Sequence, residues 1–173
     1  MIIGLSGKIK SGKTTVTEYF GKKKFTVLST SKLLKKLLKA NNLEENRENL
    51  QYLGGDLLNL VGGGGFMEIM FFNLPESDYI IDSIRHVGAS TYLRNKYGKN
   101  YYHIYVKSSD SVRYSRIKEK YGIDDRSLIE KWESAETETA NDDLERLADV
   151  IITSDGSVDE LYHQLDIFYN KIR

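Results

Sequence analysis

The sequence predicts an α/β protein in which helices flank a parallel sheet. Three observations predict it: a G-x-x-x-x-G-K-[ST] motif near the N-terminus, short apolar runs typical of strands, and a stretch with helical patterning after each run. The five runs are Ile2–Leu5, Phe25–Leu28, Tyr79–Asp82, Tyr102–Val106 and Val150–Thr153. A length of 173 residues suits one domain over residues 1–173 and is short for two.

The composition of the chain narrows the classes of protein to consider. Lysine plus arginine and aspartate plus glutamate balance at 25 each, so no general basic field attracts nucleic acid and a nucleic-acid partner is disfavoured. The absence of cysteine excludes disulfides and thiolate zinc sites. With neither an N-terminal signal nor a long apolar run, we expect a cytoplasmic protein that acts on a small molecule and not at a membrane.

The motif Gly7–Thr14 has the pattern of a loop that wraps a nucleoside triphosphate. Gly7 and Gly12 let the backbone curl until its N–H groups surround the β-phosphate, and the helix that starts here directs its partial positive charge at the same place. Lys13 would reach the β- and γ-phosphates, and the Thr14 hydroxyl would complete a Mg²⁺ shell. The residues predicted to bind ATP in this segment are Gly7, Lys10, Ser11, Gly12, Lys13, Thr14 and Thr15.

Helical spacing follows the first two apolar runs. After the loop, Val16, Tyr19 and Phe20 fall on one face of a helix. After the second run, Ser29–Ser31 is a typical helix cap, and leucine pairs alternate with lysines over Lys32–Lys39. Such lysines can bind a membrane surface or a nucleic acid, but we interpret them as the solvated face of an amphipathic helix.

No strand pattern occurs between Asn41 and Pro75. Arg47 and Gln51 are four residues apart, so they would share one face of a helix. Gly62–Gly65 interrupts the segment, and we interpret this run either as a flexible hinge between two helices or as a loop that lets a ligand come close.

Charged side chains follow the third and fourth apolar runs. Asp82 would sit at a strand end beside the phosphate loop, where a carboxylate organises Mg²⁺, and the planar fork of Arg85 suits a second anion. The alternative is a helix N-cap aspartate with a surface arginine. Arg113 and Arg116 lie three apart, which suits clamping of a triphosphate and equally suits a surface ion pair.

The three histidines share no metal-ligand spacing. We therefore interpret each of them as a structural or a solvent-exposed residue and not as a metal ligand. They are His86, His103 and His163.

Together these segments resemble the nucleoside monophosphate kinases, most specifically the phage-type deoxynucleoside monophosphate kinases. The similarity to dephospho-coenzyme A kinase and to small archaeal adenylate-kinase-like proteins is more distant. Four segments carry the resemblance in the family's order: the phosphate loop, R-x-x-x-Q-x-x-G-x-D at Arg47–Asp56, D-x-x-R at Asp82–Arg85, and Asp149–Leu161.

The resemblance implies the three-layer fold of P-loop NTPases, with a five-stranded parallel sheet, a helical acceptor-binding insert over about residues 33–75 and a short lid region over about residues 110–145. It also implies ATP and Mg²⁺ as cofactors and a small nucleotide as acceptor. Matched by position, the acceptor-binding residues would be Arg47, Gln51, Asp56 and Arg85, the lid arginines Arg113 and Arg116, the metal ligands Thr14 and Asp82, and the residue near the donor base Gly156.

The expected reaction is transfer of the γ-phosphate of ATP to a nucleoside or deoxynucleoside monophosphate, by alignment and charge neutralisation. The residues expected to take part in catalysis are Lys13, Asp82, Arg85, Arg113 and Arg116. One alternative is a kinase of a hydroxyl acceptor, such as dephospho-coenzyme A or a modified nucleic-acid base, with Asp82 as the base. Another is a nucleotide-binding switch without catalysis, although a switch needs no second phosphate site.

This chain departs from the phage enzyme in three respects. It is much shorter, it carries the Gly62–Gly65 run, and its lid segment Ile117–Glu145 is rich in acidic residues. These departures bear on the identity of the acceptor, and the sequence is also compatible with a homodimer.

Overall fold

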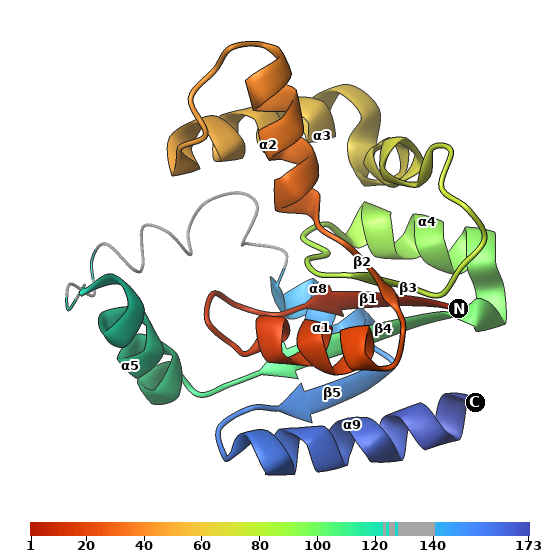
Figure 1. The fold of residues 1–173 in the computed structure, drawn as a ribbon, viewed down its shortest axis with the longest axis vertical. Coiled ribbons are helices and arrows are strands. Elements are labelled where there is room, and N and C mark those ends of the chain that lie inside the picture. The colour runs from red at the N-terminus through yellow and green to blue at the C-terminus, as the bar shows by residue number, and fades with distance from the viewer. Residues whose placement is uncertain (123, 125–126, 128–140) are drawn as a thin grey trace.

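A parallel sheet of five strands lies at the centre of the molecule, with helices on both faces (Figure 1). The structure is a computed structural model that describes residues 1–122, 124, 127 and 141–173, with the backbone but not the side chain of Arg47. The strands are β1 (Ile2–Ser6), β2 (Thr26–Leu28), β3 (Tyr79–Ile81), β4 (Tyr101–Lys107) and β5 (Val150–Thr153). The helices are α1 (Lys13–Lys22), α2 (Thr30–Ala40), α3 (Arg47–Phe71), α4 (Val87–Tyr97), the short 3₁₀ helix η1 (Gly98–Asn100), α5 (Asp110–Tyr121), α8 (Asn141–Leu147) and α9 (Val158–Ile172).

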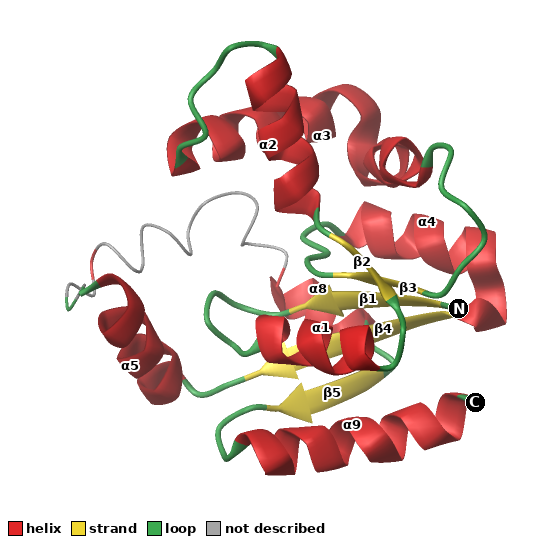
Figure 2. Cartoon of the chain, viewed as in Figure 1, coloured by secondary structure: helices red, strands yellow, loops and turns green. Residues whose placement is uncertain are grey.

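The strand order is β2-β3-β1-β4-β5, and every neighbouring pair is parallel. Ile2 of the central strand β1 pairs with Tyr79 of β3 on one side and with Tyr101 of β4 on the other. All five predicted strands are present, so the predicted α/β class with a five-stranded parallel sheet is confirmed (Figure 2). The carboxyl ends of the strands meet along one edge, where ligands gather in sheets of this kind.

Alternate residues of β1 enter two different cores because successive side chains of a strand point to opposite faces. Ile3 and Leu5 pack with α1 and α9, through side chains that include Val16, Phe20, Leu161 and Leu165. Ile2 packs with α3, α4 and α8, through side chains that include Met67, Leu93 and Leu144. Each face of the sheet is thus covered by its own helices. Within the described residues, no helix is long and apolar enough to cross a bilayer.

The capping and patterning expected for α2 agree with the structure. Ser29 is the N-cap, and its side chain accepts a hydrogen bond from the Lys32 backbone N–H at 3.3 Å. Leu38 is buried, whereas the four lysines of the helix are exposed.

The glycine run lies within a helix and is not a loop that lets a ligand come close. Two helical segments of α3 meet at Gly62, whose φ of 68° and ψ of 172° are not helical. The segment before Gly62 stands above the sheet beside α2, and the segment after it carries Phe66, Met67 and Met70 into the core (Figure 1). The interpretation as a junction between two helices therefore fits the structure.

Gly63 lets α3 cross α4 at very close range. A Cβ at this position would lie 2.6 Å from the backbone nitrogen of Ala89 and 3.0 Å from the carbonyl carbon of Gly88. Both neighbours are backbone atoms, so they cannot yield by a rotamer change. Glycine is thus required at this crossing.

Two glycine-to-alanine substitutions in α3 should have opposite effects on stability. Gly63→Ala should lower the free energy of unfolding by about 1–3 kcal/mol, because the added methyl forces the helices apart. Gly55→Ala, with no atom of the described residues within 4 Å of its added methyl, should raise it by about 0.5–1 kcal/mol through helix propensity. Urea unfolding of both variants measures the difference, and equal changes would contradict the close crossing.

A buried histidine links the sheet to the start of the phosphate loop. His103 of β4 is fully buried; its Nε2 lies 2.7 Å from Ser6 Oγ and its Nδ1 lies 3.3 Å from Ser90 Oγ. Its backbone N–H donates to Asp149 Oδ2 at 2.7 Å. Burial lowers the pKa of His103 to about 4, although the charge of Asp149 opposes this shift. The imidazole is therefore neutral at physiological pH, as a structural histidine should be.

Acidification should destabilise the fold through His103. The unfolded chain binds a proton below about pH 6.5, whereas the folded protein does so only near pH 4, so this contribution to stability is complete above pH 6.5 and is lost as the pH falls. Between pH 7 and pH 5 the loss should be about 2 kcal/mol. Urea unfolding at both pH values measures it, and His103→Gln should remove this part of the loss. The same loss in both proteins would contradict the assignment.

Candidate functional site

The loop between β1 and α1 has the backbone that its motif predicts. Gly7 and Gly12 have φ values of 138° and 105°, a region in which a residue with a side chain is strained. A Cβ on Gly7 would collide with the Val106 carbonyl oxygen of β4, and one on Gly12 would collide with Ser154 Oγ beyond β5. Helix α1 begins at Lys13, so its N-terminus faces the inside of the loop.

Lys13 lies against the inner side of this loop. Its Nζ donates hydrogen bonds to the carbonyl oxygens of Gly7 and, at 2.8 Å, of Lys8. Burial lowers the pKa of Lys13 to about 7, and the neighbouring charge of Arg85 acts in the same direction. Burial and Arg85 thus destabilise the protonated form of Lys13. Such a site favours a bound anion, because the negative charge of phosphate groups would stabilise the protonated lysine.

Asp82 lies at the end of β3 next to Lys13, as the sequence predicts. Its Oδ1 is buried and has no hydrogen-bond partner among the described residues. Burial raises the pKa of Asp82, while hydrogen bonds from Ser29 and Thr30 and the charge of Arg85 oppose this shift.

A hollow of about 220 Å³ contains Asp82 together with Lys13, Thr14, Ser31 and Arg85. Carboxylate and hydroxyl oxygens are ligands that Mg²⁺ prefers, and Mg²⁺ commonly uses one or two protein ligands plus phosphate oxygens. The unpartnered Asp82 oxygen and the exposed Thr14 hydroxyl therefore fit a magnesium ion held between protein and phosphates.

A second, larger cavity of about 830 Å³ extends from the phosphate loop in two directions. Towards α2, α3 and the start of α4 it is lined by apolar side chains and a few polar ones, among them Leu34, Gln51, Leu58, Met67, Arg85 and His86. Towards α5 and the loop after β5 it is lined by Ile9, Arg116, Tyr121, Ser154, Gly156 and Val158. We call the first part the acceptor half and the second the donor half.

The acceptor half contains some of the predicted acceptor-binding residues but not all of them. Gln51 and Arg85 line it, whereas Asp56 is exposed and does not. The structure does not bring Asp56 together with them: Gln51, Gly54 and Leu58 share the inner face of α3, and a residue two positions after Gly54 points away from it. Arg47 is the first residue of α3, and its side chain lies outside the described residues.

His86 was interpreted as structural or solvated, but the structure places it in the wall of the acceptor half. The patterning of the sequence carries no signal for this position, because His86 is the N-cap of α4 and the turn after β3 decides where it points. His163 is exposed on α9, in agreement with its interpretation.

Gly156, which the resemblance implies to be near the donor base, lines the donor half together with residues that the sequence did not indicate. Glu119, Lys120 and Tyr121 at the end of α5 line it. A signal for Lys120 existed, since it lies four residues after Arg116 on the same helix.

Arg116 joins α5 to both sides of the donor half. Its Nη2 donates to the Ser154 carbonyl oxygen at 2.6 Å, and its Nη1 donates to the Lys10 carbonyl oxygen at 3.2 Å. It lines the cavity and its guanidinium lies beside Gly12, where it can reach a bound nucleotide.

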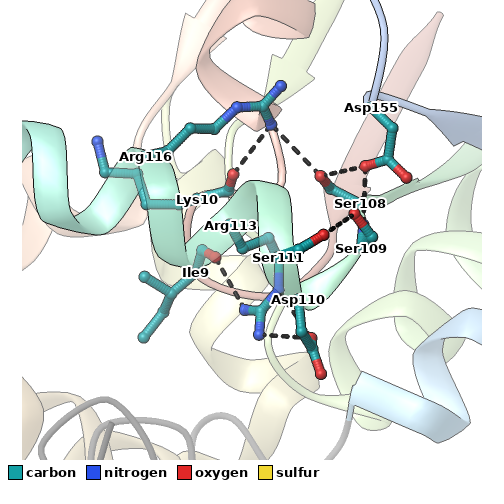
Figure 3. Close-up of polar contacts among 9 residues, drawn as sticks. All are labelled: Ile9, Lys10, Ser108, Ser109, Asp110, Ser111, Arg113, Arg116 and Asp155. Carbon is teal, nitrogen blue, oxygen red and sulfur yellow. Dashed lines mark hydrogen bonds and ion pairs between the residues drawn. The ribbon is translucent and has the colours of Figure 1, made fainter. Parts of the chain in front are cut away.

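Arg113 does not occupy the position of a lid arginine that faces the transferred phosphoryl group, so that prediction needs correction. The side chain is fully buried and lies beneath the loop (Figure 3). Its Nη1 donates to the Ile9 carbonyl oxygen at 3.0 Å, and its Nη2 pairs with Asp110 Oδ1 at 2.9 Å. Position in the first turn of α5, close to the sheet, explains the burial. The predicted lid covers about residues 110–145, and within it residues 123, 125–126 and 128–140 lie outside the described residues.

Comparisons with known proteins agree with this geometry. No family model matches the chain. It is 26% identical to dephospho-CoA kinase of Fusobacterium nucleatum subsp. nucleatum, over 99% of this chain and 98% of that relative. Its fold is similar to the crystal structure of TT1252 from Thermus thermophilus, with a TM-score of 0.71, 16% identity and coverage of 100% and 98% of the two chains. It is also similar to shikimate kinase from Bacteroides thetaiotaomicron, with a TM-score of 0.61, 15% identity and coverage of 98% of each chain. The chain thus has the fold of P-loop kinases.

Proposed function

We propose that the protein is an ATP- and Mg²⁺-dependent phosphotransferase that moves the γ-phosphate of ATP to a nucleoside or deoxynucleoside monophosphate. The observation that carries the proposal is the single cavity that runs from the donor half across the phosphate loop into the acceptor half. Arg85 lines both this cavity and the hollow beside Asp82, so it stands where the two substrates would meet. The similarity to P-loop kinases supports phosphoryl transfer from ATP.

The charges around the loop favour an acceptor that is already anionic. Among the described residues that line the cavity and the hollow, the carboxylates are Asp82 and Glu119, and only Asp82 lies beside Lys13. With Asp82 assigned to the metal ion, none is left there to take a proton from a hydroxyl group. A monophosphate needs no such base, because its oxygen is ionised at neutral pH. Leu34, Leu58 and Met67 supply an apolar surface for a flat base.

The residues of the site would act by neutralising and aligning charge. Lys13 would bind the β- and γ-phosphates, and Arg85 would orient the acceptor phosphate. An oxygen of the acceptor phosphate then forms a bond to the γ-phosphorus as the bond from that phosphorus to the β–γ bridging oxygen breaks, which releases ADP. Mg²⁺, held by Thr14 and Asp82, would supply further neutralisation of the phosphate oxygens when bound.

A second candidate is a kinase of a hydroxyl acceptor such as dephospho-coenzyme A. It is favoured by the relative from Fusobacterium nucleatum, which aligns over nearly the whole chain. In that case Asp82, whose pKa burial raises, would take the proton of the hydroxyl group.

The two candidates are separated by their acceptors. The protein is incubated with Mg²⁺-ATP and, in turn, deoxynucleoside monophosphates, ribonucleoside monophosphates, dephospho-coenzyme A and DNA, and ADP release is measured. Stimulation by a monophosphate is expected. Stimulation only by dephospho-coenzyme A or DNA would favour the second candidate, and no stimulation by any acceptor would favour a nucleotide-binding switch.

Lys13→Ala should abolish turnover and leave the fold intact. Within the described residues its ammonium group donates hydrogen bonds to loop carbonyls only, so its loss removes phosphate binding without opening the core. Steady-state kinetics and circular dichroism measure the two effects. Full activity in a folded variant would refute the assignment of the loop.

Two substitutions on α3 should distinguish its inner from its outer face. Gln51→Ala should raise the KM of the acceptor about tenfold, the effect of losing one polar contact, and should change the KM of ATP little. Asp56→Ala is the matched control and should change neither value, because Asp56 is exposed and does not line the cavity. Equal effects of the two substitutions would place the acceptor elsewhere.

A further inference from the structure

The backbone around Lys10 is held from outside the phosphate loop by two arginines of α5. Lys10 has a φ of 62°, a left-handed conformation that costs a residue with a side chain about 1 kcal/mol. The carbonyl oxygen before it, on Ile9, accepts from Arg113 at 3.0 Å, and its own carbonyl oxygen accepts from Arg116 at 3.2 Å. Both peptide groups that flank the strained residue are therefore fixed (Figure 3).

We propose that Arg113 is a positioning residue that aims the Lys10 N–H into the phosphate site, and that it does not itself contact the transferred phosphoryl group. In a trans peptide the C=O and the N–H point in opposite directions, and the described chain contains no cis peptide bond. With the Ile9 carbonyl turned towards Arg113, the Lys10 N–H faces the other way, on the side where Lys10 lines the cavity.

The contacts and the burial of Arg113 hold its guanidinium in one position. Its guanidinium is fully buried, and a buried cation is stable only where acceptors satisfy its donors. Asp110, which is 61% exposed, accepts from Nη2 at 2.9 Å and from Nε at 3.3 Å, which leaves Nη1 aimed at the loop. A planar fork that spans a carboxylate and a carbonyl in this way is a geometry that lysine cannot reproduce.

The inference rests on one part of the proposed function, which is that the loop binds a nucleotide. Binding of Mg²⁺-AMP-PNP and of AMP is measured by calorimetry, together with Tm, for the wild type, Arg113→Met and Arg113→Lys. AMP lacks the β- and γ-phosphates, so its affinity depends on the loop much less than that of AMP-PNP. Arg94→Met is the matched control, since Arg94 also pairs with an aspartate, at 2.9 Å from Asp149 Oδ2, but contacts no loop residue.

Arg113→Met should weaken AMP-PNP binding about 10- to 100-fold, the range expected for loss of a charge-assisted hydrogen bond, and should leave AMP binding within about twofold. Arg113→Lys should fall between wild type and Arg113→Met, and Arg94→Met should bind both ligands normally. If the role of Arg113 were purely structural, the substitution would lower the affinities for both ligands together with Tm.

An unchanged affinity for AMP-PNP, or an equal loss of affinity for both ligands, would overturn this inference and leave the proposed function standing. If Arg113→Met does not fold, Arg113→Lys decides, because it keeps the buried charge but breaks the fork. Failure of the wild type to bind AMP-PNP would overturn the proposed function and the inference with it.

Discussion

The close packing of the phosphate loop against the ends of β4 and β5 is the constraint on which the rest of the site depends. Gly7 and Gly12 leave no room for a side chain between the loop and its neighbours, Val106 and Ser154. This contact brings the carboxyl ends of three strands together, and it places the first turn of α5 within reach of the loop carbonyls. The donor half of the cavity exists because these segments converge on one small backbone turn.

Much of the fold and the centre of the site could be predicted from the sequence. The five strands follow from short apolar runs, of which β1 and β3 are buried throughout, and Lys13 and Asp82 follow from motifs at the ends of those two strands. Arg113 and Asp56 do not lie where the resemblance implies, for a shared physical reason. Spacing along a helix fixes which residues share a face, but only tertiary packing decides how deep a face lies and what it contacts. Arg113 and Arg116 do reach the same loop, yet one is buried beneath it and the other lines the cavity.

Two cations near the loop have different physical roles. Lys13 donates hydrogen bonds to backbone carbonyls that phosphates can replace, whereas Arg113 is paired with a carboxylate and buried. The first can exchange its partners when an anion arrives, and the second cannot do so without exposing a buried charge. The proposed triphosphate site thus combines one adaptable cation with one that is preorganised.

The break in α3 at Gly62 divides the helix into two segments, one before and one after it. In a continuous helix the orientation of one segment would fix the orientation of the other. Phe66, Met67 and Met70 after Gly62 fill the core, and Phe66 and Met67 also reach the cavity, whereas Leu50, Gln51 and Gly54 before it belong to the wall of the acceptor half. Since a non-helical residue resets the helical phase, changes in the wall need not be matched by changes in the core. The segment from α2 to Val61 can therefore change in sequence while the phosphate loop and the core stay the same. Related chains can in this way bind different acceptors on one unchanged scaffold.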